Sequence, residues 1–386
     1  MKLKAYQRPD GKAGVRNHIL ILPTCCCSSE VCRIAAGQVD GAVHVINQNG
    51  CGQTKGDLEI TRQVLAGLAA NPNVYGTVLV GLGCENNQPD EMMELIRAKT
   101  NKPLARVVIQ EEGGTLGATK KAVGYARQMA QEASLLEREE VDICRFIIGT
   151  ECGGSDPTSG IAANVVVGDL SDRLVDAGAS SILCETTELI GAEHLLAERG
   201  ATPEIGRQIL NIVKRYEVHL KNVGENLRLG NPAPGNKAGG ITTLEEKSLG
   251  CIHKGGHRPI VEVIDYAQAP KEKGLIIMDT PGHDMASVTG LAAGGVQIIV
   301  FTTGRGTPTG NPIVPVIKLT ANRYTFDNMR DNIDFDVSPV MDGSKTVTQM
   351  GAELLEELRL VANGKKTKAE VYGFNDIAIS RLCNYV

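Results

Sequence analysis

Short apolar runs rich in valine, isoleucine and leucine alternate with longer amphipathic segments along most of this 386-residue chain. This alternation is typical of parallel sheets built from strand–helix–strand units. Because single hydrophobic cores stop growing beyond about 250–300 residues, we expect an α/β fold with two successive doubly wound, mostly parallel sheet domains. The charged segment 137–142 precedes a fresh apolar run. We therefore expect an N-terminal α/β domain over 1–142 and a C-terminal α/β domain over 143–386.

The expected strands are 18–23, 42–47, 76–83 and 104–111 in the first domain, and 145–150, 180–184, 260–266, 274–279, 296–302 and 316–321 in the second. Apolar residues at helical spacing predict helices over 58–70, 90–99, 117–136, 161–177, 204–221, 287–293 and 347–361. The segment 229–240 contains two prolines and four glycines, so we expect no regular structure there.

Composition excludes several classes of protein. The formal net charge is −5, with eight tyrosines, five phenylalanines and no tryptophan, so the chain lacks the cationic surface and stacking residues typical of nucleic-acid binding. No apolar stretch approaches the ~20 residues of a membrane span, and the first residues do not form a secretion leader. We expect a soluble, cytoplasmic protein. Its eleven cysteines then favour free thiols or metal ligands over disulfides.

Nearly every predicted strand is followed by a glycine-rich loop that carries cysteine, glutamate, aspartate or threonine. Such loops meet at one edge of an open α/β sheet, where ligands bind. A strand-to-helix loop also needs glycine and a capping residue simply to turn, and that explanation stays open for any one loop. It does not explain the recurrence of cysteine. The cysteines in these loops therefore indicate thiolate chemistry or metal ligation. The alternative is that they are unreactive side chains that only fill space. They are Cys51, Cys84 and Cys152.

Common cofactor and metal motifs are absent from the sequence. There is no HExxH pair, no GxGxxG after the first strand and no GxxxxGK[ST]. A helix-borne zinc hydrolase is excluded on this ground, and a dinucleotide cofactor or ATP has no positive support.

Several segments together form a recognisable pattern: 8–11 with 14–17, 50–52, 83–85, 151–156, 185–193, 231–250, 279–282 and 301–306. They include the run Pro-Gly-Asn-Lys-Ala-Gly-Gly at 234–240, which is too long to match by chance. The pattern resembles the catalytic region of the altronate and galactarate dehydratase family over almost the whole chain. The same family includes the large subunit of (2R)-sulfolactate sulfo-lyase. One departure is Asn47, where members of the family often carry a histidine three residues before Gly-Cys-Gly.

The resemblance implies a metal-dependent lyase that removes water from a sugar acid such as altronate or galactarate, giving a 2-keto-3-deoxy acid. Iron(II) or manganese is the implied cofactor, and three thiolates could alternatively hold an iron–sulfur cluster. The alternative activity is that of the sulfo-lyase, which releases sulfite and pyruvate. Two other classes stay open: a non-catalytic binding subunit and an iron–sulfur electron carrier. The first is opposed by acid and base residues in the loops, the second by the absence of closely spaced cysteine motifs.

The resemblance also implies roles for particular residues. We expect Lys237, Glu151, Glu185 and Asp279 to be catalytic, with Lys237 as the base or the carboxylate anchor. We expect Arg305, Asn236 and Thr303 to bind substrate, with Arg305 as a clamp on its carboxylate or sulfonate. Cys51, Cys84 and Cys152 are the expected metal ligands.

Partners follow from the same resemblance. Many dehydratases of the family carry a small N-terminal SAF-type domain, whereas split members carry it as a separate subunit. This sequence begins at the catalytic region. We therefore expect a separate SAF-type small subunit and an oligomer, with a small hydroxy acid as substrate and no nucleic-acid or membrane partner.

Overall fold

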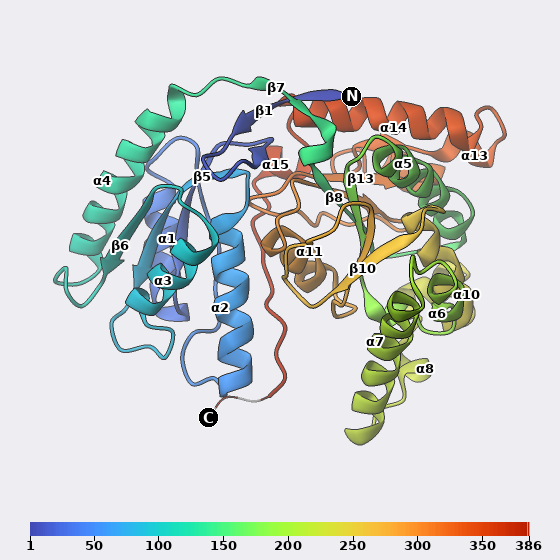
Figure 1. The fold of residues 1–386 in the computed structure, drawn as a ribbon, viewed down its shortest axis with the longest axis horizontal. Helices are drawn as coiled ribbons and strands as arrows, with labels where there is room; N and C mark the ends of the chain where they lie inside the picture. The colour runs from blue at the N-terminus through green and yellow to red at the C-terminus, as the bar shows by residue number, and fades with distance from the viewer. Residues whose placement is uncertain (384, 386) are drawn as a thin grey trace.

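The computed structural model describes residues 1–383 and residue 385 (Figure 1). Its first sheet has four parallel strands in the order β4-β3-β5-β6. The strands are β3 (His18–Pro23), β4 (Ala42–His44), β5 (Val74–Gly81) and β6 (Leu104–Val108). One face is covered by α1 (Ser29–Ala36) and α4 (Thr115–Ser134), and the other by α2 (Lys55–Ala70) and α3 (Pro89–Lys99). The sheet is therefore doubly wound, with its switch point between β3 and β5.

The second sheet has seven parallel strands in the order β10-β11-β9-β8-β12-β13-β14. The strands are β8 (Ile147–Cys152), β9 (Ser180–Leu183), β10 (Ile260–Ile264), β11 (Leu275–Met278), β12 (Ile298–Thr302), β13 (Val316–Thr320) and β14 (Phe335–Asp336). Helices α5 (Asn164–Asp176) and α14 (Val347–Ala362) pack on one face, and α11 (Asp284–Ala293) on the other. The prediction of two doubly wound, mostly parallel sheets is confirmed.

The remaining helices are short, apart from α7 (Pro203–Asn222), which packs beside β10. They are α6 (Glu193–Ala197), α8 (Leu227–Gly230), α9 (Pro234–Gly239), α10 (Leu244–Cys251), α12 (Arg323–Asn328), α13 (Ser338–Met341) and α15 (Lys368–Tyr372). The expectation of no regular structure over 229–240 is wrong, because α9 lies within it. Pro234 is the first residue of α9, where its missing N–H costs no hydrogen bond.

A third, antiparallel sheet of three strands joins the start of the chain to the second domain. It has the order β2-β1-β7 and comprises β1 (Lys2–Gln7), β2 (Ala13–Gly14) and β7 (Glu139–Asp142). Leu3 and Ala5 of β1 are buried in the core that β8, β12, α5 and α14 form. The first residues of the chain therefore contribute to the core of the second sheet, although they precede the first sheet in the sequence.

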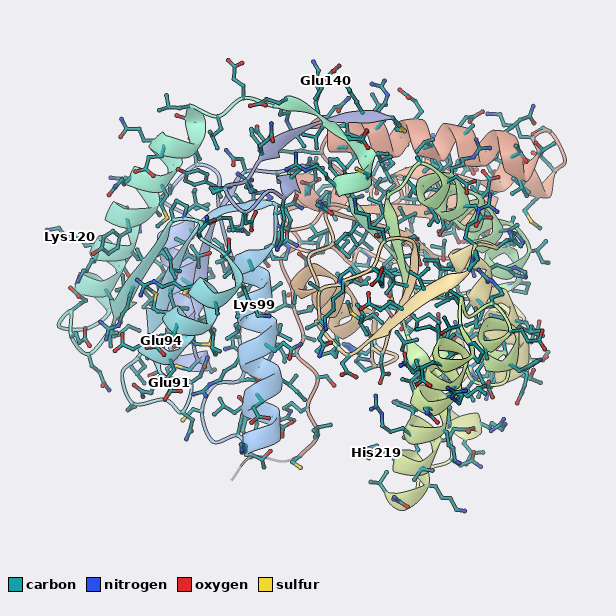
Figure 2. All side chains as sticks on the ribbon, viewed as in Figure 1. Glu91, Glu94, Lys99, Lys120, Glu140 and His219 are labelled. Carbon is teal, nitrogen blue, oxygen red and sulfur yellow. The ribbon has the colours of Figure 1, made fainter. Side chains whose placement is uncertain are left out.

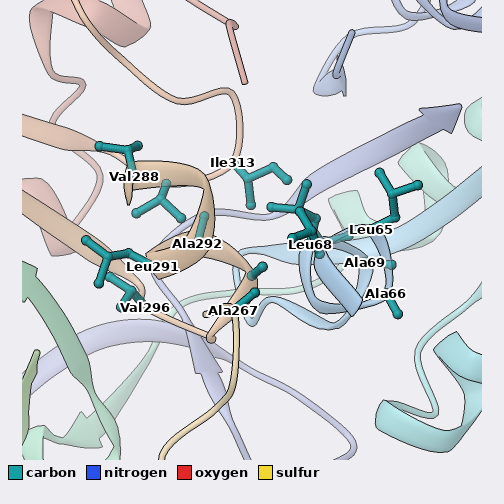
Figure 3. Packing of buried hydrophobic residues seen from close by; sticks show 14 of the residues in the cluster. Leu65, Ala66, Leu68, Ala69, Ala267, Val288, Leu291, Ala292, Val296 and Ile313 are labelled. Atoms are coloured by element: carbon teal, nitrogen blue, oxygen red, sulfur yellow. The ribbon is translucent and has the colours of Figure 1, made fainter. Parts of the chain in front are cut away.

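The two sheets share a hydrophobic core, in which α2 packs against α11 (Figure 3). Leu65 and Leu68 of α2 belong to the same cluster as Val288 and Leu291 of α11. The helices touch at Gly67, where an added Cβ would lie 2.3 Å from the carbonyl oxygen of Ala293. Any larger residue at position 67 would push the helices apart, so this contact fixes one domain against the other.

Charged side chains cover the outer helices, as Glu94, Lys99 and Lys120 illustrate (Figure 2). Within the described residues, no helix combines the length and apolarity that a membrane span requires.

Candidate active site

The candidate site lies at the carboxyl edge of the seven-stranded sheet. The chain passes from β8 to β9 on one side and later to β12 on the other, so the sheet switches direction between β8 and β12. This is where doubly wound sheets place their ligands. Strand β8 ends in Glu151 and Cys152, and the loop after β9 carries Glu185 and Glu188. The loop after β11 leads into α11 at Asp284.

Three carboxylates converge at this edge. Ligand oxygens of Glu151, Glu185 and Asp284 all lie within 4.8 Å of one another, and we call these residues the carboxylate group. Glu151 Oε2 accepts hydrogen bonds from Ser287 Oγ (2.9 Å) and Cys184 Sγ (2.6 Å). Glu151 Oε1 and Glu185 Oε2 are buried and have no hydrogen-bond partner among the residues that the structure describes. Buried polar atoms are normally paired, so these two oxygens are suited to a bound ion or ligand.

Burial raises the pKa of every member of the carboxylate group. Burial, partly offset by the charge of Lys254, raises the pKa of Glu151 to about 7. Burial and then the neighbouring Glu151 charge raise the pKa of Glu185 well above its usual range. Burial, followed by the charge of Glu188, raises the pKa of Asp284. Ionising all three carboxyls at once is therefore unfavourable, and a bound divalent cation would stabilise their charged forms.

The backbone supports this convergence at two unusual positions. Glu185 has a φ of +67°, a left-handed conformation that is uncommon for residues other than glycine. Its backbone N–H donates to Thr280 Oγ1 at 2.7 Å, which ties the loop after β9 to the loop after β11. A Cβ at Gly153 would lie 2.0 Å from Asp284 Oδ2. Glycine at 153 is therefore needed for Asp284 to approach the end of β8.

A second buried cluster holds Glu188 between two lysines. Lys254 Nζ lies 3.0 Å from Glu188 Oε2, and Lys247 Nζ lies 3.1 Å from Glu188 Oε1. Glu188 and Lys254 are almost fully buried, whereas Lys247 is half-buried. Burial opposes ionisation of Glu188, but the charges of Lys254 and Lys247 outweigh it and lower the pKa of that carboxyl. Glu188 is thus held as a carboxylate beside three carboxyls whose pKa values are raised.

Cys152 joins this second cluster. Its Sγ lies 2.8 Å from Lys254 Nζ, 2.9 Å from Glu188 Oε2 and 3.5 Å from Cys251 Sγ. Cys152, Glu188 and Cys251 could geometrically hold a metal ion. However, the ammonium of Lys254 already contacts two of the three ligand atoms, and a second cation there would be repelled. The carboxylate group is therefore the better candidate for a metal.

A cavity of about 320 Å³ opens between the two clusters. Its volume lies at the lower end of the range for small-molecule sites. Cys152, Glu185, Glu188, Asp284, Lys247 and Asn236 contribute to its wall. The cavity wall thus combines carboxylates with an ammonium, an arrangement suited to a small anionic molecule with a bound cation.

Known protein families match most of the chain. The family profile described as "D-galactarate/Altronate dehydratase, C-terminal" matches residues 143–384, and the profile described as "D-galactarate dehydratase/Altronate hydrolase, second domain" matches residues 5–134. The chain belongs to the galactarate/altronate dehydratase family.

Three members of this family illustrate its range of activities. The chain is 34% identical to altronate dehydratase of Bacillus subtilis, over 97% of this chain and 77% of that protein. It is 37% identical to (2R)-sulfolactate sulfo-lyase subunit beta of Chromohalobacter salexigens, over 98% and 96%. It is 36% identical to galactarate dehydratase (L-threo-forming) of Escherichia coli, over 81% and 61%. All three names denote lyases, and the chain is a lyase of this family.

The structure brings some of the residues that the family resemblance singled out into the site. Glu151 and Glu185 lie in the carboxylate group, and Cys152 lies beside it. Asn236 is buried in the cavity wall and donates to the Ser155 carbonyl at 2.8 Å. Asp279 lies nearby but outside the group, because its carboxylate pairs with Arg215 and accepts a hydrogen bond from Thr186.

Other residues singled out by the sequence do not line this cavity. Lys237 on α9 and Arg305 after β12 are both exposed. Thr303 is buried, and its Oγ1 accepts the Gly306 N–H at 2.9 Å, which closes a turn. Cys51 and Cys84 are exposed in loops of the first sheet. Among the described residues, neither belongs to a three-ligand group with Cys152.

Sequence reasoning missed four residues of the site: Glu188, Lys247, Lys254 and Asp284. Asp284 lies two residues after the family-like segment 279–282, and Lys247 lies within the segment 231–250. Those segments could have led to them. Lys254 lies in an unremarkable stretch between two histidines, and only the fold reveals its contact with Glu188.

Proposed function

We propose that this lyase removes water from a sugar acid such as altronate or galactarate and forms a 2-keto-3-deoxy acid. The observation that carries the proposal is that Glu185 and Asp284 of the carboxylate group share one cavity with an ionised Glu188 and the Lys247 ammonium. The carboxylate group also has two unpaired oxygens. Removal of a proton next to a carboxylate creates a dianion, which requires cationic stabilisation and a base. The dehydratases among the relatives support the same chemistry.

The carboxylate group fits the implied divalent cation. Iron(II) and manganese accept carboxylate oxygens, and the unpaired oxygens of Glu151 and Glu185 are available to a ligand. Glu151, Glu185 and Asp284 would hold the ion. When bound, such an ion supplies Lewis-acid stabilisation of the negative charge that develops on the substrate and the leaving hydroxyl.

Lys247 is the proposed anchor for the substrate carboxylate. Its Nζ lies in the cavity wall and its ammonium is retained, because the charge of Glu188 outweighs the effect of burial and raises its pKa. Lys254 has a positioning role. It is fully buried behind Glu188 and fixes both that carboxylate and the Cys152 thiol.

Glu188 is the proposed base that takes the proton from the substrate. It is the one carboxyl in the cavity whose pKa is lowered, so it is unprotonated at neutral pH. When a substrate carboxylate binds Lys247, part of the positive charge that lowers the pKa of Glu188 is redirected to the substrate. Substrate binding therefore makes Glu188 more basic. Pairs of carboxyls whose pKa values are pushed apart commonly divide acid and base roles.

The sulfo-lyase activity is the second candidate. It is supported by 37% identity over 96% of a sulfo-lyase beta subunit. Sulfite departs as an anion without a proton, so this reaction needs the same base and anchor but no acid for the leaving group.

One experiment distinguishes the two. The chain is incubated without oxygen, with iron(II) or manganese, and with altronate, galactarate or sulfolactate in separate reactions. A 2-keto acid without sulfite supports the dehydratase, and sulfite with pyruvate supports the sulfo-lyase. If no substrate yields either product, with or without a small subunit, the proposal is wrong.

We also propose a separate small subunit as a partner, since one relative is named as a beta subunit. The subunit would complete an active site that must exclude water. Gel filtration of the chain mixed with a candidate SAF-type subunit tests association, and assay of the mixture tests activation. Equal turnover by the isolated chain would argue against a required partner.

A further inference from the structure

Five of the eleven cysteines are exposed, and four of these lie at one edge of the first sheet. Cys26 and Cys27 follow β3, Cys51 follows β4 and Cys84 follows β5. We call these four residues the thiol rim. Free cysteines are among the most buried residues in proteins. Four exposed thiols on three neighbouring loops are therefore not explained by packing.

The three loops are hydrogen-bonded to one another, so the thiols share one surface. The backbone N–H of Cys26 donates to the Asn49 carbonyl at 3.1 Å. The Gly52 N–H donates to Asn86 Oδ1 at 2.8 Å, and the Asn87 N–H donates to the Gly50 carbonyl at 2.9 Å. The loop of Cys51 is therefore hydrogen-bonded both to the loop of Cys26 and to the loop of Cys84.

Close backbone approach and a buried carboxylate fix the loops further. Gly50 has a φ of +99°, and a Cβ there would lie 2.2 Å from the Thr24 carbonyl oxygen. Glu85 is buried and accepts hydrogen bonds from Thr24 Oγ1 (2.5 Å) and the backbone N–H groups of Leu82 (3.0 Å) and Gly83 (2.6 Å). The loop that carries Cys84 is thus held against the loop that carries Cys26.

The thiol rim also occupies the switch point of the first sheet. Strand β3 lies between β4 and β5, and the connecting helices α1 and α2 cover opposite faces. Loops that follow the strands on either side of such a point form the usual ligand crevice of a doubly wound sheet. The fold and the cysteines therefore point independently to a ligand at the same place.

The spacing of the thiols decides between two kinds of metal centre. One tetrahedral ion with metal–sulfur bonds of ~2.3 Å would need sulfur atoms about 3.8 Å apart. Among the described residues, no three ligand atoms of the rim lie within 4.8 Å of one another. An iron–sulfur cluster accepts a wider arrangement, because each thiolate binds a different iron atom. We propose that the thiol rim holds an iron–sulfur cluster through Cys51, Cys84 and Cys26 or Cys27.

This centre is distinct from the carboxylate group of the second sheet and does not depend on the proposed function. Cys152, which the sequence grouped with Cys51 and Cys84, is replaced in it by Cys26 and Cys27. The thiols release their protons as they bind iron.

Anaerobic reconstitution of the full chain with ferric and ferrous iron and sulfide tests the proposal. Iron, acid-labile sulfide and visible absorption are measured after desalting. We expect wild type to retain iron and sulfide in similar amounts, and C51S, C84S and the double variant C26S/C27S to retain less than a fifth of that content. Cys144→Ser, a half-buried cysteine before β8, is the matched control and should retain the full content. Circular dichroism establishes that each variant is folded.

Wild type that retains no sulfide, or iron without sulfide, would overturn the proposal. So would full retention by both C51S and C84S. Glu151→Gln separates this proposal from the catalytic one, because its cluster content should equal that of wild type.

Discussion

The ammonium of Lys254 lies 3.0 Å from Glu188 Oε2, and both side chains are almost fully buried. A buried pair of this kind contributes little net stability compared with an apolar pair, but loss of one partner leaves a buried, unpaired charge. The position of Glu188 in the cavity therefore depends on a residue that contributes nothing to the cavity wall.

The first prediction concerns stability. Lys254→Met leaves the Glu188 carboxylate with only Lys247 and should lower the free energy of unfolding by about 3–5 kcal/mol. Chemical denaturation measures the change. Lys214→Met, at an exposed position of α7, should change it by less than about 0.5 kcal/mol. Equal stability of the two variants would mean that the buried pair does not form.

The second prediction concerns pH. Burial raises the pKa of Glu151 from 4.5 to about 7, so the folded state favours the protonated form. The resulting stability is fully present below about pH 4.5 and is lost as pH rises through about 7. Between pH 4.5 and 7, with a chelator present, the free energy of unfolding of wild type should fall by up to about 3 kcal/mol relative to that of Glu151→Gln. Burial lowers the pKa of His18 to about 4, so the contribution of His18 to stability changes with pH in the opposite direction. That contribution is the same in both proteins and cancels in the comparison. If the free energies of unfolding of wild type and Glu151→Gln changed equally with pH, the prediction would be contradicted.

The third prediction concerns the cation. Glu185→Gln and Asp284→Asn each remove a charge from the carboxylate group and should weaken Mn²⁺ binding at least tenfold, as measured by electron paramagnetic resonance. Asp279→Asn is the matched control, because Arg215 and Thr186 already engage that carboxylate. It should leave Mn²⁺ affinity within twofold. A larger effect at Asp279 than at Asp284 would contradict this prediction and place the metal at Asp279.

The fourth prediction compares two lysines on the segment that covers the cavity. Lys247→Met removes the proposed substrate anchor and should raise KM at least tenfold. Lys237 is exposed on α9 and has no part in the cavity wall, so Lys237→Met should have a smaller effect on KM. If Lys237→Met raised KM more than Lys247→Met did, the role that the family resemblance implies for Lys237 would be supported. Such a result would also show that the segment moves when substrate binds.

Sequence patterns located the sheets well and the site only partly. Buried parallel strands such as β12 are continuous β-branched runs, and this composition is visible without a structure. The pairing of β1 with β7 joins residues more than 130 positions apart and leaves no local signal. Glu151 and Glu185 were found because they lie at or just beyond the carboxyl ends of β8 and β9. Lys254 was not, because its role arises only when the turn Ile252–Gly255 packs against α5 and β8.

The most direct test of the proposed mechanism is turnover by Glu188→Gln. Glutamine keeps the shape of the side chain but cannot accept the substrate proton, so 2-keto acid formation should fall by roughly 10²–10⁴-fold, while Mn²⁺ affinity stays within twofold of wild type. Turnover within threefold of wild type, with substrate and metal bound normally, would show that Glu188 is not the base.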